Sequence, residues 1–99
     1  MSDTARLVAH AAMQVDGVTG LHGGQYGEVA TYLPGEQIAG VLLGESIGEV
    51  HLVTDLRRNV WTIAEEVRAA AEQIAGMPMI VTVEDVVTED VVAEEQSNE

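Results

Sequence analysis

The sequence predicts a small two-layer α+β domain in which two helices cover one face of a three-stranded mixed sheet. Residues 49–56 alternate between apolar and polar side chains, which is typical of a half-buried strand. Residues 63–74 instead repeat apolar residues every three or four positions, as one face of a helix does. Residues 78–87 are rich in β-branched residues and indicate a second strand, parallel to the first by a right-handed crossover. The predicted order is helix, glycine loop, strand, strand, helix, strand.

The first element is predicted to be a helix from Asp3 to Val15, because its alanine content favours helix and its apolar residues have helical spacing. Ser2 or Asp3 is expected to cap the start of this helix, and Gly17 to end it. The apolar stripe expected to face the core consists of Leu7, Val8, Ala11 and Val15.

Five glycines fall within residues 17–27 and predict a shaped loop, because glycine adopts backbone conformations that other residues avoid. A glycine loop can cradle phosphate where it opens a helix after a strand, but this loop follows a helix and no lysine accompanies it, so we interpret it as a structural turn. Residues 28–33 are predicted to form a short helix that Pro34-Gly35 ends. Residues 38–43 are predicted to be the first strand, followed by a hairpin turn at residues 45–48.

The alternation of the central strand assigns its side chains to two faces. Val50, Leu52 and Leu56 are expected to face the core together with Thr54. The opposite face is expected to be either solvated or an interface, and it carries Glu49, His51 and Asp55.

The second helix is predicted to begin with a capping box formed by Thr62 and Glu65. Trp61 lies just before this cap, so we expect it to pack back on the first turn, with exposure for a partner as the alternative. Gly76 and Pro78 mark the end of the helix. Its apolar stripe consists of Ile63, Val67, Ala70, Ala71 and Ile74.

The composition limits the classes of function. A net charge of −13, from 17 acidic residues and 4 arginines, should repel nucleic acids and anionic membranes at long range. The absence of cysteine excludes disulfides and cysteine-based zinc sites. The sequence has neither a secretory signal nor an apolar run of about 18 residues, so we expect a cytoplasmic protein with no membrane insertion. We expect residues 1–87 to form a single domain and residues 88–99 to be an acidic, disordered tail.

Several short motifs, taken in order, resemble the alkaline shock protein family, also called general stress proteins, of the bacterial envelope stress response. The resemblance covers about residues 3–87. The motifs are Gly17-Val-Thr-Gly20, Gly23-Gly24, Gly27, Glu49-Val-His-Leu-Val53, Ile63-Ala-Glu-Glu-Val-Arg68, Gly76 and Val81-Thr-Val-Glu-Asp-Val86.

The resemblance implies a non-enzymatic scaffold protein without cofactors, acting by self-association or by binding a membrane-anchored partner. Such a partner would recruit this cytoplasmic protein to the inner face of the cell membrane. The chain departs from the family where a glycine-containing turn with proline is usual, since it has Arg57-Arg-Asn-Val-Trp61 there. The partner of this protein therefore need not be the one that members of the family bind.

The candidate partner-binding surfaces are the exposed face of the central strand, the turn that follows this strand, and the glycine loop. Their residues are His22, Tyr26, Glu49, His51, Asp55, Arg57, Arg58 and Trp61.

A KH-like nucleic-acid-binding or regulatory module is the alternative, because Gly24-Gln-Tyr-Gly27 matches the GxxG loop with which KH domains clamp backbone phosphates. In this sequence the segment lies between two predicted helices. No basic residue lies near this loop in the sequence, which argues against it. The three histidines, His10, His22 and His51, lack the spacing of a helical metal pair. With neither a serine elbow nor a cysteine nucleophile, the sequence predicts no catalytic, cofactor-binding or metal-binding residues.

Overall fold

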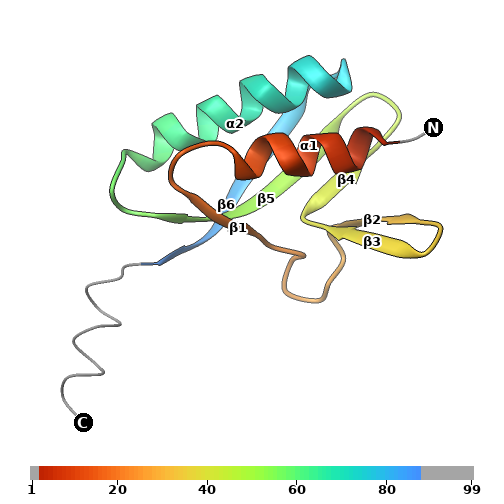
Figure 1. Ribbon diagram of the computed structural model, residues 1–99, viewed down its shortest axis with the longest axis horizontal. Coiled ribbons are helices and arrows are strands. Elements are labelled where there is room, and N and C mark those ends of the chain that lie inside the picture. The colour runs from red at the N-terminus through yellow and green to blue at the C-terminus, as the bar shows by residue number, and fades with distance from the viewer. Residues whose placement is uncertain (1–2, 88–99) are drawn as a thin grey trace, which may run out of the picture.

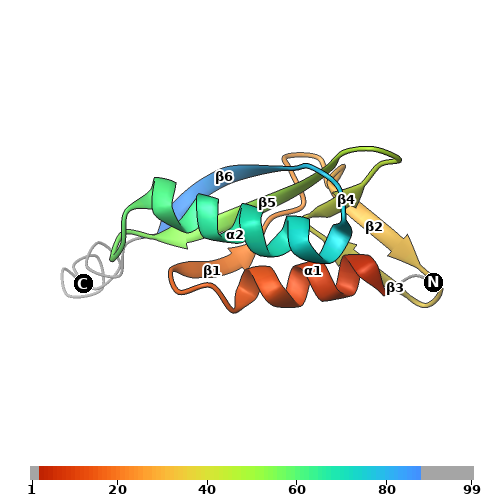
Figure 2. The ribbon, with the colours of Figure 1, turned by 90° about the horizontal axis from the view of Figure 1, so that it is seen from above.

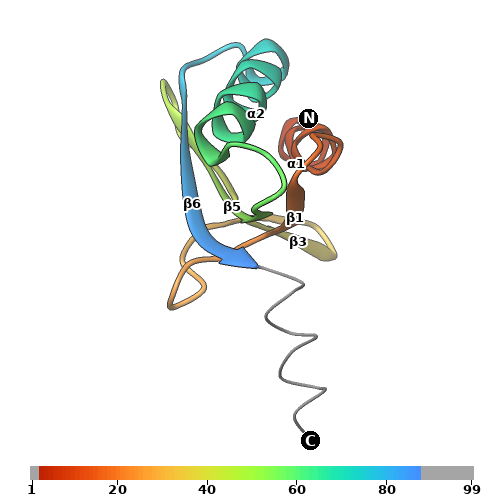
Figure 3. The same ribbon diagram turned by 90° about the vertical axis from the view of Figure 1, so that its left-hand side faces the viewer.

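Two helices pack against one face of a mixed sheet in the computed structural model, which describes residues 3–87 (Figures 1 and 3). The fold is a small two-layer α+β domain, and the fold class predicted from the sequence is confirmed. The predicted tail, residues 88–99, lies outside the described residues. The elements in chain order are α1 (Thr4–Met13), β1 (Val18–Leu21), β2 (Ala30–Leu33), β3 (Glu36–Ala39), β4 (Val41–Leu43), β5 (Gly48–Asp55), α2 (Val60–Ala75) and β6 (Met79–Val87).

Strand β5 is the centre of the sheet. β6 runs parallel to it along one edge, as the strand–helix–strand pattern predicts. β4 and β1 share the other edge end to end, with β4 antiparallel to residues 48–50 and β1 antiparallel to residues 52–54. The four strands therefore fill three rows, which agrees with the predicted three-stranded sheet.

Gly40 makes this shared edge possible. Its C=O accepts a hydrogen bond from His51 N–H, and the next bond along the edge runs from His22 N–H to His51 C=O. Gly40 has a φ of +88°, and a Cβ there would lie 2.7 Å from the Cβ of Leu21. Only glycine allows the chain to cross so close to the end of β1.

The short helix predicted for residues 28–33 is wrong, since residues 30–33 form β2 of a separate hairpin with β3. Pro34-Gly35 lies in the turn of this hairpin, and Gly35 has a φ of +79°. Six residues are too few for a helix to be stable on its own, whereas Thr31 and Tyr32 favour strand. The single strand predicted for residues 38–43 is divided by Gly40 into β3 and β4. The loop predicted for residues 17–27 is wrong at its start, because residues 18–21 form β1 and pair with β5.

The core lies between the helices and the sheet. Figure 2 shows α1 and α2 side by side; α2 packs on β5 and β6, and α1 packs on β1 and β4. The predicted core residues Val50, Leu52 and Thr54 of β5 are fully buried, as are Ile63 and Val67 of α2. The centre of the core is therefore the part of the chain where the two periodicities are clearest.

Three predicted core positions are wrong or marginal. Leu7 is exposed, because α1 instead turns Ala5, Val8 and Ala12 inwards. Leu56 is exposed because it follows the last residue of β5, where the alternation of the strand no longer holds. Ile74 is partly exposed at the end of the α2 stripe.

The start of α2 differs from the predicted capping box. The helix begins at Val60, and the side chain of Asn59 accepts the Thr62 N–H at 3.1 Å. Trp61 thus belongs to the first turn of the helix rather than preceding it. The predicted end is confirmed, since Gly76 caps α2 with a φ of +72°. Within residues 3–87, neither helix is long and apolar enough to cross a membrane.

Candidate protein-interaction site

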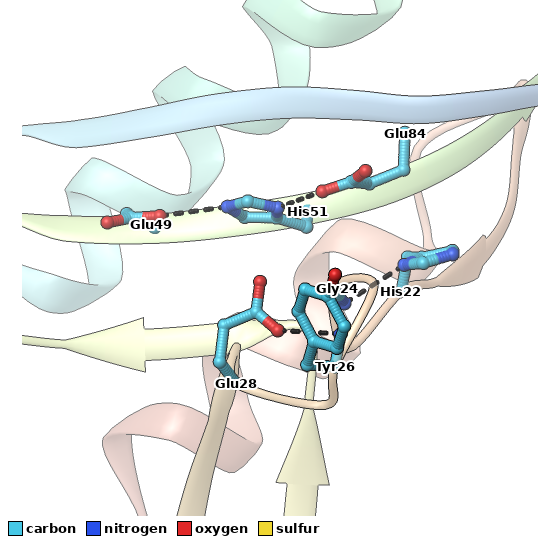
Figure 4. Close-up of polar contacts among 7 residues, drawn as sticks. All are labelled: His22, Gly24, Tyr26, Glu28, Glu49, His51 and Glu84. Atoms are coloured by element: carbon cyan, nitrogen blue, oxygen red, sulfur yellow. Dashed lines mark hydrogen bonds and ion pairs between the residues drawn. The ribbon is translucent and has the colours of Figure 1, made fainter.

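The candidate residues lie in three separate places. Glu49 and His51 are on the sheet face opposite the helices, with His22 and Tyr26 in the loop beside them (Figure 4). Asp55, Arg57 and Arg58 are at the turn between β5 and α2, and Trp61 is on the first turn of α2.

His51 lies between two carboxylates, which with it form the His51 cluster (His51, Glu49 and Glu84; Figure 4). Its Nε2 is 2.8 Å from Glu49 Oε1, and its Nδ1 is 2.5 Å from Glu84 Oε2. Between Val83 and Asp85 the register of β6 against β5 shifts, so Glu84 has no partner residue across β5. His51 is paired with Thr82, so Glu84, two residues further along β6, is its diagonal neighbour on the same face of the sheet.

The His51 cluster uses the full hydrogen-bonding capacity of the imidazole ring. Burial alone would lower the pKa of His51, but the hydrogen bonds to Glu84 and Glu49 outweigh it and raise that pKa above its ordinary value. In the protonated form both ring nitrogens donate, one to each carboxylate. Only 12% of the His51 side chain is exposed. The cluster therefore links β5 to β6, and neither ring nitrogen is left to bind a partner.

The glycine loop is likewise folded by its own contacts. His22 Nδ1 accepts the Gly24 N–H at 3.0 Å, and Glu28 Oε1 accepts the Tyr26 N–H at 2.9 Å. The N–H groups of Glu28 itself and of Tyr26 hold the pKa of the Glu28 carboxyl below its ordinary value. A Cβ at Gly24 would lie 2.6 Å from Glu28 Oε2, so the carboxylate lies directly over this glycine.

These contacts bear on the KH alternative. The Gly24–Gly27 segment connects β1 to β2, so the expectation that it joins two helices is wrong. A carboxylate covers Gly24, where a KH domain would hold phosphate. Tyr26 is exposed at this loop.

At the turn after β5, the expectation that Asp55 is exposed is wrong, because the residue is only 8% exposed. It lies where β5 ends beside Gly17, and Arg57 folds back on it with Nε 2.8 Å from Oδ2. This hydrogen bond lowers the pKa of Asp55. Arg58 donates to both carboxylate oxygens of Glu66, at 3.1 and 2.7 Å.

The turn therefore offers little free charge to a partner. Arg58 also donates to the Asp16 C=O at 2.7 Å and so ties the turn to the end of the α1–β1 connection. Arg6 and Arg68 form ion pairs as well, with carboxylates on their own or neighbouring elements. All four arginines are thus ion-paired within residues 3–87.

Trp61 has a different environment. Its side chain is 84% exposed, so the predicted packing on the helix start is wrong. It borders an apolar groove of about 310 Å³ between α2 and β6. We call this the Trp61 groove, and its residues are Val60, Trp61, Ala64, Val81 and Val83. A large exposed aromatic ring beside an apolar groove is the typical composition of a binding hot spot.

Sequence reasoning missed the residues that complete these places. Val81 and Val83 alternate with polar Thr82 and Glu84, which indicates a strand with two different faces. The sequence does not show that α2 lies beside the valine face, so the groove between them was not predicted. The contact between Glu84 and His51 depends on the pairing of His51 with Thr82, a register for which the sequence has no signal. Within residues 3–87, no group of three or more histidine, aspartate and glutamate side chains is arranged to hold a metal ion.

No protein-family model, curated protein or solved structure gives a significant match to this chain.

Proposed function

We propose that this protein is a non-enzymatic interaction module that binds a protein partner through the Trp61 groove. The observation that carries the proposal is the 84% exposure of Trp61 beside the apolar groove between α2 and β6. Tryptophan is enriched among residues that dominate binding energy, and a groove next to it supplies the surface that a partner side chain fills. A tryptophan exposed to this degree buries little apolar surface in the free domain.

The polar candidate residues are less suited to binding a partner, which also favours the Trp61 groove. The His51 cluster, Asp55 with Arg57, and Arg58 with Glu66 each satisfy their charges within the chain. A partner that bound them would first have to replace those contacts, at a cost that offsets much of the gain. The groove requires no such exchange.

The biological setting of the proposal rests on the resemblance to the alkaline shock proteins. In this setting the chain acts as a scaffold of the bacterial envelope stress response in the cytoplasm. It either associates with itself or binds a membrane-anchored protein that recruits it to the inner face of the membrane.

Photo-crosslinking in the cells that produce the protein tests the proposal. A photoreactive aromatic residue, which keeps a ring beside the groove, replaces Trp61 in one version of the full chain and Tyr32 in another. Tyr32 is a suitable control because it is an aromatic residue with 72% exposure, located on the β2–β3 hairpin instead.

The expected result is one specific partner captured from position 61 and not from position 32. The purified complex should then weaken at least tenfold with Trp61→Ala. If position 61 captures nothing beyond what position 32 captures, or if Trp61→Ala leaves the affinity of the purified complex unchanged, the proposal is wrong.

A further inference from the structure

The outer edge of β6 adjoins the Trp61 groove. Within residues 3–87, β6 pairs only with β5, and α2 covers one of its faces. An edge strand presents backbone N–H and C=O groups that can pair with an extended segment of another chain. β6 is long for such an edge, with nine residues from Met79 to Val87.

The outward-facing groups can be assigned from the hydrogen bonds. The Pro78 C=O accepts the Gly48 N–H, so the backbone of Pro78 faces β5. Because successive residues of a strand turn their backbone groups to opposite sides, those of Met79, Val81 and Val83 face outwards. The Met79 N–H agrees with this assignment, since it donates to Glu72 Oε2 at 3.0 Å rather than to β5.

Side chains cover both ends of this edge and leave its middle open. At one end the Glu72 carboxylate occupies the Met79 N–H, and at the other the Asp85 carboxylate accepts the Val86 N–H at 2.8 Å. The outward groups between them are those of Val81 and Val83. The side chains of the same two residues line the Trp61 groove. The open backbone and the apolar groove thus coincide.

The two faces beside this edge differ in chemistry. A residue paired with Val81 or Val83 would place its side chain on the groove face, next to Trp61. Its neighbours in sequence would point to the opposite face, where β6 carries Ile80, Thr82 and Glu84. The described chain has 12 acidic residues and 4 arginines, a net charge of −8, and all four arginines are already paired.

We propose that the partner segment is an extended strand with apolar and basic residues in alternation, which adds to the open edge of β6. The inference rests on the proposed function of the Trp61 groove and names the kind of partner that fits it. Apolar side chains of the segment occupy the groove, and its lysine or arginine side chains supply the positive charge that this surface lacks. A second copy fits less well, because its own β6 carries Glu84 and Asp85 and its net charge is −13.

A titration of the full chain with three nine-residue peptides tests the inference. The first alternates valine and lysine, the second has the same composition at helical spacing, and the third alternates valine and glutamate. Trp61 is the sole tryptophan, so its emission reports groove occupancy directly. Amide hydrogen exchange measured by NMR reports pairing at Val81 and Val83.

The expected result is a blue shift of Trp61 emission and slower exchange at Val81 and Val83 with the valine–lysine strand peptide, at an affinity that falls with added salt. Neither control peptide should protect these two amides. Val83→Pro removes an outward N–H without removing a bond to β5, so it should weaken binding about fivefold more than Val83→Ala does. Val81→Pro is the second variant if Val83→Pro fails to fold.

Other results overturn the inference in distinguishable ways. A blue shift without protection of Val81 and Val83, or an equal response to the helical isomer, would exclude strand addition while the groove remains a binding site. A blue shift that depends on protein concentration alone would identify a second copy as the occupant. If none of the three peptides binds at millimolar concentration, the basic strand is excluded as the partner segment. The proposed function would be excluded separately, by a failed capture at position 61 or by an unchanged affinity of the Trp61→Ala complex.

Discussion

The His51 cluster and the Trp61 groove are both on the surface. The polar groups of the cluster are paired within the chain, whereas the groove has an exposed aromatic ring and, within residues 3–87, unpaired backbone groups. In the cluster, both imidazole nitrogens contact carboxylates and the ring is 12% exposed. In the groove, Trp61 is 84% exposed and the backbone of Val81 and Val83 faces outwards. Titratable residues on a strand face suggest chemistry, yet here they hold two strands together. The apolar residues are the ones that a partner would complete.

The largest expected effect is on binding. Trp61→Ala should cost about 2 kcal/mol or more of binding free energy, because a hot-spot ring is lost. The free energy of unfolding should change by less than about 0.5 kcal/mol, since the side chain packs little in the free protein. Calorimetry with the captured partner and urea denaturation measure the two quantities. Tyr32→Ala is the control, and an equal loss of affinity in that variant would remove the distinction between the groove and the rest of the surface.

The reverse pattern is expected for the His51 cluster. At pH 6, His51→Gln should lower the free energy of unfolding by about 1–3 kcal/mol, because a charge-assisted hydrogen bond is lost and Glu49 and Glu84 then lack their shared cation. Partner affinity should stay the same. A double-mutant cycle with Glu84→Gln isolates the His51–Glu84 interaction. A variant that retains full stability and loses the partner would show that this cluster is the binding site.

A smaller effect is expected where the groove depends on the local structure of α2. Asn59→Ala should cost about 1 kcal/mol of stability, because it removes the cap that accepts the Thr62 N–H. It should also weaken binding modestly, since the frayed first turn carries Val60 and Trp61. Thr62→Ala is the matched variant, and urea denaturation should place its effect within about 0.5 kcal/mol. A larger loss of stability in Thr62→Ala than in Asn59→Ala would contradict the Asn59 cap and support the capping box predicted from the sequence.

The smallest effect is a dependence of stability on pH. The folded pKa of His51 is raised above 6.5, so its contribution is fully present below pH 6.5 and is lost as the pH rises through the folded pKa. The groups facing the ring are Glu49 on β5 and Glu84 on β6, with charge contributions linking it to Glu28 in the loop. The stability difference between the parent protein and His51→Gln, measured by denaturation at a series of pH values, should therefore shrink as the pH rises. A difference that grew with pH would mean that the neutral imidazole is the stabilising form.

The sequence predicts the centre of this fold well because periodicity records burial. Val50, Leu52, Ile63 and Val67 occupy the predicted positions, since each belongs to an element long enough for its period to be read. The β2–β3 hairpin was missed because residues 28–33 are too few to show a period. The only local signal for the strand is the β-propensity of Thr31 and Tyr32.

The candidate site was less predictable than the core, for reasons that are local. Asp55 and Leu56 were misplaced because the strand ends there and its alternation stops. Trp61 was expected to pack on the helix because the cap was assigned to Thr62, whereas Asn59 starts the helix three residues earlier. The groove itself needs the alignment of α2 with β6, which no single stretch of sequence encodes.

Hydrogen exchange of the full chain with and without its captured partner tests the distinction between groove and cluster most directly. We predict slower exchange in residues 60–64 and 81–83, and unchanged exchange in residues 22–28 and 49–51. Protection confined to residues 22–28 and 49–51, with the groove unaffected, would contradict the account and identify the His51 face as the binding surface.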